Sequence, residues 1–282
     1  MICGNIKSLF IILFCVVSGY FVIIIKHKFP IIVIESYHQV QNIFNHQSSD
    51  TLILFDVDDT LIQSSSHDFA ARGVEAWPWW WHIWLIMRYP WVLLPSYWEW
   101  FYSIMWQQTP RYIIEPEVVS LIAYAQQRGC PVVALTGIES GAYGIIESFP
   151  EWRYTMLKNM GILFSQPCSD MVFDTLPLYR DTYPILYKGI LCANHQPKGM
   201  VLKAFLAQCA LKPARVIFFD DTYENLQSVG GACAQLDIPC TLYQYAGARY
   251  QKDSLDFYVF KQHVEHVWTT GHWSLQEQQE NA

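Results

Sequence analysis

The sequence predicts an α/β fold, a doubly wound parallel sheet with helices on both faces. The evidence is three apolar runs of strand length, each ending at a polar or acidic residue: Thr51–Phe55 before Asp56, Pro131–Leu135 before Thr136, and Arg215–Phe219 before Asp220. Runs this short and this apolar are typical of parallel strands buried on both faces. Helical patterns separate the runs, and such alternation is typical of the α/β class.

The other elements follow from hydrophobic periodicity and from residues that end helices. Helices are predicted over 35–47, 116–128, 198–210, 223–236 and much of 141–160, and short strands over 162–164, 190–192 and 241–245. The helix over 116–128 is the clearest, because Pro116 suits its first turn and Gly129 ends it. In such sheets a ligand binds beyond the carboxyl ends of the strands.

One long segment interrupts this alternation. Residues 61–115 lie between the first two core strands and hold nine of the twelve tryptophans. Because the segment leaves from the carboxyl edge of the sheet, we expect a helical, tryptophan-rich cap above the site. The predicted organisation is therefore an N-terminal segment over 1–28, a core over 29–60 and 116–262, the cap over 61–115, and a loosely ordered polar tail over 263–282.

The cap tryptophans have three interpretations. They can form the packed interior of the cap. They can also form an aromatic wall for an apolar or aromatic leaving group, or contact a membrane interface, where tryptophan and tyrosine are favoured. A spanning segment is excluded, because Arg88 and the prolines at 78, 90 and 95 interrupt the apolar run.

The N-terminus carries a targeting signal. From Ser8 to Ile25 there are 18 residues without a charge, nearly all of them apolar. As a helix this stretch would be roughly 27 Å long, close to the thickness of a bilayer core. It is a cleaved signal peptide or a membrane anchor, with the buried first helix of a soluble domain as a third alternative. We therefore expect an exported or membrane-anchored protein, placed in a bacterial periplasm or secreted, with membrane association through the N-terminus.

Composition excludes several classes of partner and site. A hydrophobic fraction of 52% and a charged fraction of 15% argue against disorder. The net charge of -7, without a run of basic residues, argues against nucleic-acid binding. The eight cysteines form no CxxC pair, so a zinc site of ordinary spacing is not expected. Buried free thiols are favoured, with one or two disulfides if the chain is exported.

Carboxylates gather at the predicted site and suit phosphoryl transfer. Such a transfer needs an in-line nucleophile, neutralisation of the phosphoryl oxygens and a proton donor for the leaving group. Asp56 can act as the nucleophile and form an aspartyl-phosphate. Asp56 and Asp220 are the natural ligands for Mg²⁺, which binds through one or two carboxylates and waters. Asp58 can turn toward the leaving oxygen and act as general acid and then as general base.

Two further groups are expected at the phosphoryl group. Thr136 supplies a hydroxyl and nearby main-chain amides, and Lys198 supplies a fixed positive charge. Lys203 is a rival to Lys198, although Lys198 begins a helix and precedes Gly199. Acidic residues after a strand also serve only as turn or helix-cap residues, and Asp221 has the alternative of holding Lys198 or a main-chain amide.

The same residues resemble a known superfamily. Four short stretches look like the four motifs of the haloacid dehalogenase (HAD) superfamily. They are Asp56-Val-Asp-Asp-Thr60, Leu135-Thr136-Gly137, Lys198-Gly199 and Phe219-Asp220-Asp221. A narrower resemblance is to a bacterial branch known as a domain of unknown function, DUF2608, through Gly189-Ile-Leu, Lys198-Gly199, Val201-Leu202 and Phe218–Leu226. Together these cover about residues 50–245. The resemblance implies a Rossmann-like core.

The resemblance also implies a reaction and a metal. It implies Mg²⁺ held by the carboxylate of Asp56, the main-chain carbonyl of Asp58 and the acid Asp220, with Asp221 in support. HAD dehalogenases lack the second aspartate, so Asp58 implies phosphate chemistry. Asp59 stands where many relatives have glycine, although other phosphatases of the superfamily carry an acid there.

We therefore expect a Mg²⁺-dependent phosphohydrolase that acts on phosphate monoesters of small molecules. The alternative is a membrane-associated binding or host-interaction protein on a HAD scaffold with little or no turnover. The apolar N-terminus and the aromatic cap motivate this alternative. The cap would select the substrate, and it carries no specificity motif.

Overall fold

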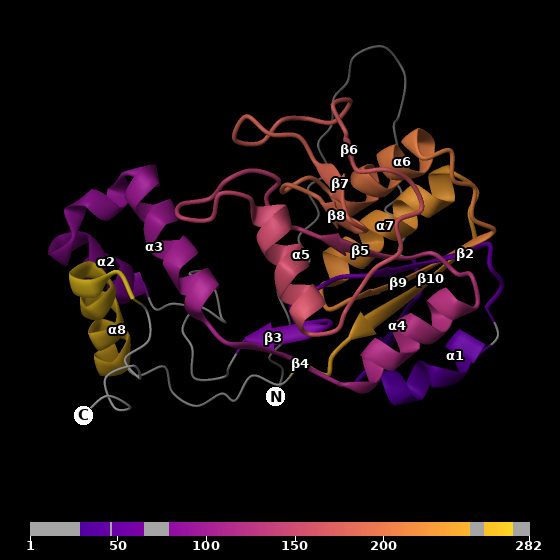
Figure 1. Cartoon of the computed structure of the whole chain (residues 1–282), viewed down its shortest axis with the longest axis horizontal. Helices are drawn as coiled ribbons and strands as arrows, with labels where there is room; N and C mark the ends of the chain where they lie inside the picture. The colour runs from indigo at the N-terminus through magenta and orange to yellow at the C-terminus, as the bar shows by residue number, and fades with distance from the viewer. Residues whose placement is uncertain (1–28, 46, 65–78, 249–256, 273–282) are drawn as a thin grey trace, which may run out of the picture.

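An eight-stranded, mostly parallel sheet forms the centre of the molecule (Figure 1). The computed structural model describes residues 29–45, 47–64, 79–248 and 257–272. From edge to edge the strands are β1 (Ile31–Ile34), β10 (Cys240–Tyr245), β9 (Arg215–Asp220), β2 (Thr51–Phe55), β5 (Val132–Thr136), β8 (Ile190–Cys192), β7 (Ile185–Tyr187) and β6 (Met171–Val172). Neighbours from β1 to β8 pair in parallel, whereas β7 and β6 are antiparallel.

Side chains of the central strands alternate between two buried layers. In β2, Ile53 and Phe55 belong to one layer, and Leu52 and Leu54 belong to the other. Three helices pack on the first layer, α1 (Gln41–Asn45), α4 (Glu117–Gln127) and α5 (Phe149–Asn159), and two on the second, α6 (Lys198–Gln208) and α7 (Tyr223–Gln235). Both faces of β2 are buried, so its sequence is one continuous apolar run. The predicted doubly wound α/β fold is confirmed.

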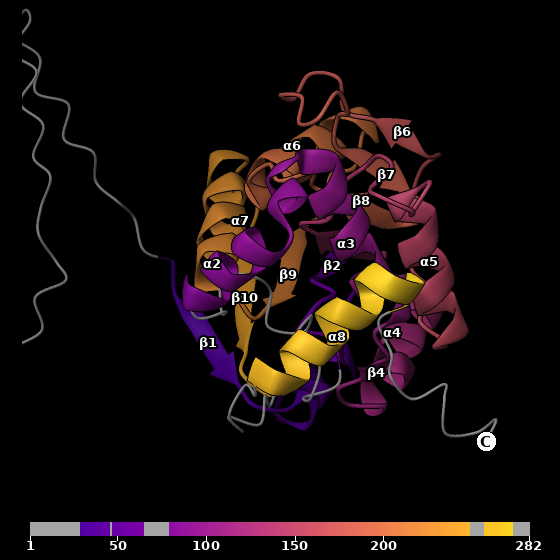
Figure 2. The same cartoon turned by 90° about the vertical axis from the view of Figure 1, so that its left-hand side faces the viewer.

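A helical unit, the cap, lies at the carboxyl ends of the parallel strands (Figures 1 and 2). It leaves β2 through β3 (Ile62–Ser64) and returns through β4 (Arg111–Ile113), and these two strands pair antiparallel. Between them lie α2 (Trp79–Arg88), the 3-10 helix η4 (Pro90–Leu93) and α3 (Pro95–Gln108). The cap has its own apolar cluster, which includes Trp81, Leu85 and Phe101. The insertion after the strand of Asp56 is therefore a helical cap.

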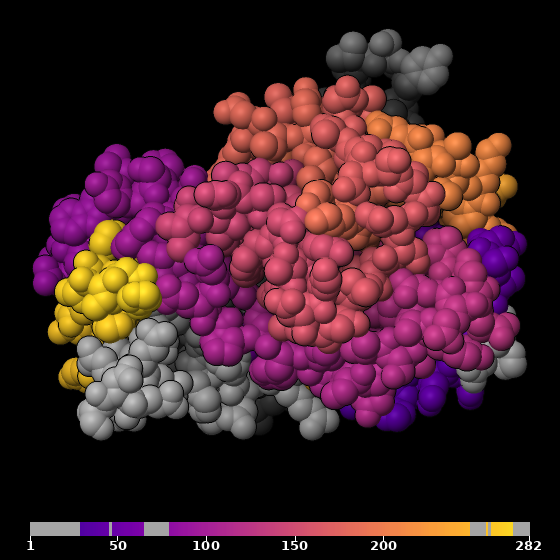
Figure 3. Space-filling view, in the orientation of Figure 1, coloured from indigo at the N-terminus to yellow at the C-terminus, as the bar shows by residue number. Residues whose placement is uncertain are grey.

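The C-terminal helix belongs with the cap. Helix α8 (Phe257–Thr270) lies against α2 and α3, as its yellow surface in Figure 3 shows. Val264 and Val267 are fully buried, and the ring of Trp268 lies 5.0 Å from that of Trp100. The prediction of a loosely ordered tail from residue 263 is wrong for 263–270. The polar composition hid a narrow apolar stripe, whose three residues fall on one face of the helix.

Two local predictions also need correction, and one strand was not predicted at all. Strand β1 was not anticipated, and it pairs with β10 at the sheet edge. No strand forms over 162–164; instead the Ser165 N–H donates to the Val132 carbonyl at 2.7 Å as the chain passes. Helix α5 begins at Phe149 rather than near 141, because the Ser148 side chain caps it.

A disulfide joins Cys168, which precedes β6, to Cys209 at the end of α6, with 5.8 Å between their Cα atoms. Of the other cysteines in the described ranges, Cys130, Cys192 and Cys233 are buried free thiols, and Cys240 is a partly buried one. The sequence allowed for one or two disulfides but did not give their pairing.

None of the helices in the described ranges combines the length and the apolar character needed to cross a bilayer. The segment Ser8–Ile25, predicted to be a signal peptide or a membrane anchor, lies outside those ranges, so this expectation stays a prediction. Trp77, which the sequence assigns to the predicted cap, also lies outside them.

Candidate active site

The carboxyl ends of β2 and β9 bring three aspartates together. The two strands are neighbours, with Phe55 opposite Phe219, and the Asp56 N–H donates to the Phe219 carbonyl at 2.8 Å. One carboxylate oxygen from each of Asp56, Asp220 and Asp221 lies within 4.8 Å of the others. Strand register therefore gathers acids that lie far apart in the sequence.

Lys198 lies between two of these carboxylates. Its Nζ is 2.5 Å from Asp56 Oδ1 and 2.7 Å from Asp220 Oδ2, and the residue is only 4% exposed. Lys198 is the first residue of α6, and the next residue explains its position. A Cβ at Gly199 would lie 2.1 Å from the Ser228 carbonyl oxygen of α7. Glycine thus allows α6 to approach α7 closely, and this contact sets where Lys198 enters the site.

The alternatives left by the sequence can be compared directly. Lys203 lies on the surface, where its Nζ donates to Gln235 Oε1 at 2.8 Å. The structure therefore brings Lys198, rather than Lys203, to the aspartates. Lys198 is bonded to Asp56 and Asp220, whereas Asp221 accepts a hydrogen bond from the Thr222 hydroxyl at 3.2 Å.

Three residues that the sequence analysis gave no role hold the aspartates in place. Oδ1 of Asp220 accepts hydrogen bonds from the Thr222 N–H at 2.8 Å and from Asn225 Nδ2 at 3.1 Å. The buried Thr60 hydroxyl lies 3.5 Å from Asp56 Oδ2 and accepts the Asp221 N–H at 3.2 Å. Thr60 lies in the first motif of the superfamily resemblance, and Asn225 lies in the Phe218–Leu226 stretch of the DUF2608 resemblance, so these two stretches already pointed to both residues.

The carboxyl groups of the cluster are harder to ionise than ordinary aspartates. Burial raises the pKa of Asp56 to about 7, with Lys198 opposing and Asp220 adding to the rise. Burial, followed by the charge of Asp56, raises the pKa of Asp221 to about 6. The pKa of Asp220 is also raised by burial. When ionised, the three carboxylates carry more negative charge than the one ammonium of Lys198 can neutralise. An added cation would neutralise the rest.

Asp58 turns away from the cluster toward Arg153 of α5. Two bonds of 2.8 Å join Arg153 Nη1 and Nη2 to the two carboxylate oxygens of Asp58. Partial removal of water around Asp58 favours its neutral form, but Arg153 offsets this and lowers the pKa of Asp58 below its usual value. The Asp58 carboxylate is therefore ionised and oriented. Its side chain is not among the clustered carboxylates, and the resemblance assigns it to the metal only through its main-chain carbonyl.

Arg153 is a site residue that the sequence analysis missed. It is 3% exposed, although arginine is rarely buried without a partner. Its guanidinium also lies 5.3 Å from the ring centroid of Trp152. No local pattern in α5 marks this position, since the partner of Arg153 is on another element.

Thr136 lies at the end of β5 and is 1% exposed. Main-chain bonds tie the loop after it to the loop before Lys198. The Ala193 N–H donates to the Thr136 carbonyl at 2.8 Å, and the Asn194 N–H donates to the Ile138 carbonyl at 3.0 Å. In the second loop the half-exposed His195 lies 3.4 Å from Glu139, and its ring centroid lies 4.3 Å from that of Tyr179, with the two rings tilted.

Ion pairs connect the cap to the loop after Thr136. Arg180, between β6 and β7, has Nη1 2.9 Å from Glu99 Oε1 of α3 and 3.5 Å from Glu139 Oε1. A cavity of about 380 Å³ opens beside Arg180. The cap residues that line it are His82, Leu85, Ile86, Val92, Leu93, Pro95 and Trp98.

The tryptophans divide among the interpretations given to them. Trp81 is 1% exposed and belongs to the cap interior, whereas Trp98 lines the cavity. Trp79 is 72% exposed. The cap therefore has a packed interior together with an aromatic outer surface.

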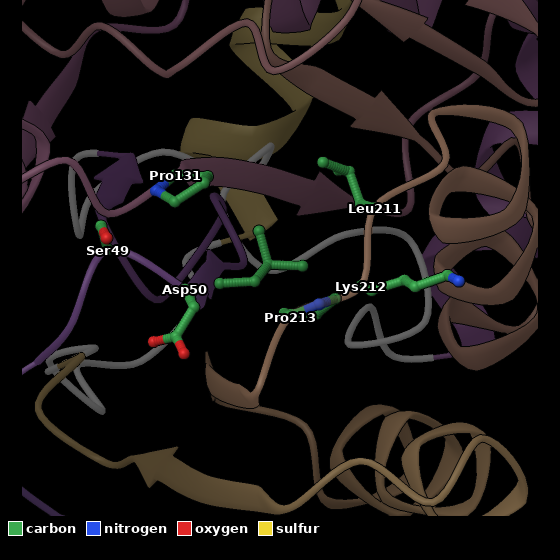
Figure 4. A pocket seen from close by; sticks show the side chains of 7 residues that line it. Ser49, Asp50, Pro131, Leu211, Lys212 and Pro213 are labelled. Atoms are coloured by element: carbon green, nitrogen blue, oxygen red, sulfur yellow. The ribbon is translucent and has the colours of Figure 1, made fainter.

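A second hollow, shown in Figure 4, lies at the end of the sheet opposite the aspartate cluster. Its volume is about 120 Å³, and its lining includes Asp50, Pro131 and Lys212. These residues precede β2, β5 and β9, so the hollow lies at the amino ends of the strands. It is separate from the aspartate cluster.

Comparison with known proteins gives a family and several relatives. The family described as "Protein of unknown function (DUF2608)" matches residues 33–278. The uncharacterized protein RP296 of Rickettsia prowazekii is 24% identical over 248 residues, which is 83% of each chain. An uncharacterized protein of Rickettsia felis is 31% identical over 103 residues, which is 35% of each chain.

One solved structure is also similar. It is a HAD family hydrolase from Salmonella enterica subsp. enterica serovar Typhi, with 12% sequence identity and a TM-score of 0.33. The similarity covers 75% of this chain and 77% of that chain. A TM-score this low carries no argument about function.

Proposed function

We propose that this chain, which belongs to the DUF2608 family, is a Mg²⁺-dependent phosphohydrolase acting on phosphate monoesters. The observation that carries the proposal is the buried cluster in which Lys198 joins Asp56 and Asp220 at the ends of two adjacent strands. Burying charges is costly for a fold, and clustered groups with shifted pKa values favour a functional site.

The donor set of the cluster suits Mg²⁺. Asp56, Asp220 and Asp221 offer carboxylate oxygens within 4.8 Å of one another, and Mg²⁺ prefers such hard oxygen ligands. These three residues would hold the ion, together with the main-chain carbonyl that the resemblance implies for Asp58. A bound Mg²⁺ would neutralise charge on the phosphoryl oxygens.

Asp56 supplies the nucleophile. One of its carboxylate oxygens attacks phosphorus, the bond from phosphorus to the ester oxygen breaks, and the phosphoryl group is carried on Asp56. Lys198 contacts Asp56 already and stabilises the negative charge of the phosphoryl oxygens. Thr136, at the end of the adjacent strand β5, contributes its hydroxyl to the same group.

Asp58 moves the proton in both steps. In the first step Asp58 acts in its protonated form, the minor form while Arg153 is bonded to it, and gives its proton to the leaving ester oxygen, which departs as an alcohol. In the second step its carboxylate takes a proton from water as that water attacks phosphorus and the bond to Asp56 breaks. Arg153 is a positioning residue, because its two bonds aim Asp58 and favour the ionised form needed for the second step.

The test is to trap the site and to measure turnover in the same preparation. With beryllofluoride and Mg²⁺, the full chain is expected to form a stable adduct on Asp56. Asp56→Asn is expected to prevent the adduct and to lower phosphate release from an aryl phosphate by at least about 10³-fold. The matched control is Lys203→Met, which removes a surface lysine and leaves turnover unchanged.

The opposite result would favour the alternative of a binding protein on a HAD scaffold. In that case no phosphoester of a broad panel is hydrolysed, no adduct forms on Asp56, and Asp56→Asn changes nothing. Circular dichroism of the variant separates this outcome from a failure to fold.

A further inference from the structure

Trp152 of α5 contacts two arginines that belong to different parts of the chain. Cζ of Arg153, its neighbour in α5, lies 5.3 Å from the centroid of the Trp152 ring. Cζ of Arg111, in β4, lies 5.1 Å from the same ring, and Figure 1 shows α5 beside the pair of β3 and β4. The face of an indole ring attracts a guanidinium at such distances because it carries partial negative charge. The ring of Trp152 therefore links α5 to a strand that connects the cap to the core.

The guanidinium of Arg153 depends on this contact for its place in the protein. Nη1 and Nη2 bind the two carboxylate oxygens of Asp58 at 2.8 Å each. Within the described residues, the buried Nε of Arg153 has no hydrogen-bond partner. Two parallel bonds fix the guanidinium and the carboxylate relative to each other, but they do not fix the pair relative to the rest of the protein. The contact with the Trp152 ring supplies a restraint of that second kind.

The Trp152 ring is itself held in place by packing. It stacks on Phe149, one turn earlier in α5, with the ring centroids 5.1 Å apart and an angle of 11° between the planes. The Phe149 ring in turn lies 5.1 Å from that of Trp106 in α3. Arg111 is held at the same place, because its Nη1 donates to the Trp106 carbonyl at 2.6 Å. Trp152 therefore has the fixed surroundings that a residue needs in order to orient another.

A second connection joins Asp58 to Arg111 through the main chain. Asp58 forms a β-bridge with Ile62, the first residue of β3, and β3 pairs with β4, the strand of Arg111. One route from Asp58 thus runs through the two strands, and the other runs through Arg153 and Trp152. Because both routes end at Arg111, the side chain and the main chain of Asp58 are referred to the same point of the fold.

We infer that Trp152 is a positioning residue, which holds Arg153 so that Asp58 faces the leaving oxygen of the substrate. The inference rests on the proposed hydrolase function, because it concerns the orientation of the general acid of that reaction. It adds a link between the acid and the strands that carry the cap, since Arg111 contacts the same ring. Trp152 touches no reacting atom in this scheme and acts through Arg153.

The kinetic test compares Trp152→Leu, which removes the aromatic ring, with Trp152→Phe, which keeps one. Trp152→Leu is expected to lower kcat/KM at least about fivefold more for glycerol phosphate than for p-nitrophenyl phosphate, because only the alkoxide needs the proton. Trp152→Phe is expected to retain most of the activity on both. The matched control is Trp91→Leu, which removes a ring in the cap and is expected to leave the ratio of the two substrates unchanged. Equal losses on the two substrates in Trp152→Leu would overturn the inference, because a general loss of folded protein has that effect.

A double variant tests whether Trp152 acts through Arg153. If it does, Trp152→Leu combined with Arg153→Met loses no more kcat/KM for glycerol phosphate than Arg153→Met alone. A further loss as large as that of Trp152→Leu in the natural chain would overturn the inference.

A measurement without substrate separates this inference from the proposed function. Nuclear magnetic resonance of the full chain with isotope-labelled arginine reports rotation of the Arg153 guanidinium, and Arg153→Lys identifies its signals. Separate Nη signals are expected in the natural chain and in Trp91→Leu, and merged signals are expected in Trp152→Leu. Separate signals in Trp152→Leu would overturn the inference even in an active hydrolase, as would merged signals in the natural chain. If no phosphate is released and no adduct forms on Asp56, the hydrolase proposal fails, while merging in Trp152→Leu alone still supports the placement of Asp58 by Trp152.

Discussion

The carboxyl ends of the central strands and the cap differ in which side chains they bury. At the carboxyl ends of the strands, Lys198 and Asp220 are buried and bonded to each other, so directional contacts fix their positions. In the cap, the buried groups include Trp81 and Leu85, and even the outer side of α2 is apolar. When one partner of a buried ion pair is removed, the other charge is left buried without a partner. Apolar side chains can repack around a substitution of similar volume.

This difference indicates which region carries out the proposed reaction. The carboxylates and the lysine at the carboxyl ends of the strands are its reactive groups, and we expect substitutions there to change turnover by orders of magnitude. The charged side chains of the described cap helices α2 and α3 are Arg88 and Glu99, and neither belongs to the aspartate cluster, so we expect substitutions in these helices to change stability more than turnover. Four predictions test this contrast, from the largest expected effect to the smallest.

Asp58→Asn is expected to lower kcat/KM for an alkyl phosphate by about 10³-fold, and for an aryl phosphate by much less. The reason is that an alkoxide leaves only with a proton, whereas a nitrophenolate leaves without one. The measurement compares kcat/KM for glycerol phosphate and p-nitrophenyl phosphate. Asp50→Asn, at the amino end of β2, serves as the control. An equal loss on both substrates would contradict the role of Asp58.

Arg153→Met is expected to lower kcat/KM for the alkyl phosphate by about 10- to 100-fold at its optimum, through lost positioning. It should also move the limb of the pH profile that reports Asp58 to higher pH. Arg153 lowers the pKa of Asp58, so removing it raises that pKa, and the protonated acid then persists to higher pH. Arg153→Lys keeps the charge and should shift the limb less. An unchanged limb in Arg153→Met would rule out this account.

The affinity for Mg²⁺ is expected to rise by about tenfold from pH 6 to pH 7 and to level off above pH 8. The metal binds ionised carboxylates, and the pKa values of Asp56 and Asp221 are raised to about 7 and about 6. Both groups therefore lose protons within this window as the pH rises. Calorimetry in buffers of different ionisation enthalpy measures the affinity and the protons released. A pH-independent affinity without proton release would contradict the arrangement.

Trp268→Ala is expected to change the turnover of a small aryl phosphate by less than about twofold while lowering the free energy of unfolding by about 2 kcal/mol. The loss comes from the packing of the Trp268 ring against Tyr89 and Trp100. Urea denaturation measures the stability, with the exposed Thr269→Ala as the control. A tenfold loss of turnover would break the contrast, because it would couple the cap to the chemistry.

Prediction from the sequence worked best where a local pattern fixes the answer. The strand before Asp56 is apolar at every position because both of its faces are buried, so it was recognisable without the fold. Helix α8 was missed because its buried stripe is narrow and the surrounding residues are polar. The cap was located through an interruption in the alternation, which says nothing of how its helices pack.

The sequence by itself determined the class of fold and the acids that meet at the carboxyl ends of the strands. Acids that follow buried parallel strands converge there, whatever the length of the connections between them. Only the tertiary structure decided that Lys198 is the lysine between Asp56 and Asp220, and that Arg153 holds Asp58. It also decided the pairing of Cys168 with Cys209. Each of these contacts joins segments distant in the chain, and their distances depend on how helices pack on the sheet, which no local pattern encodes.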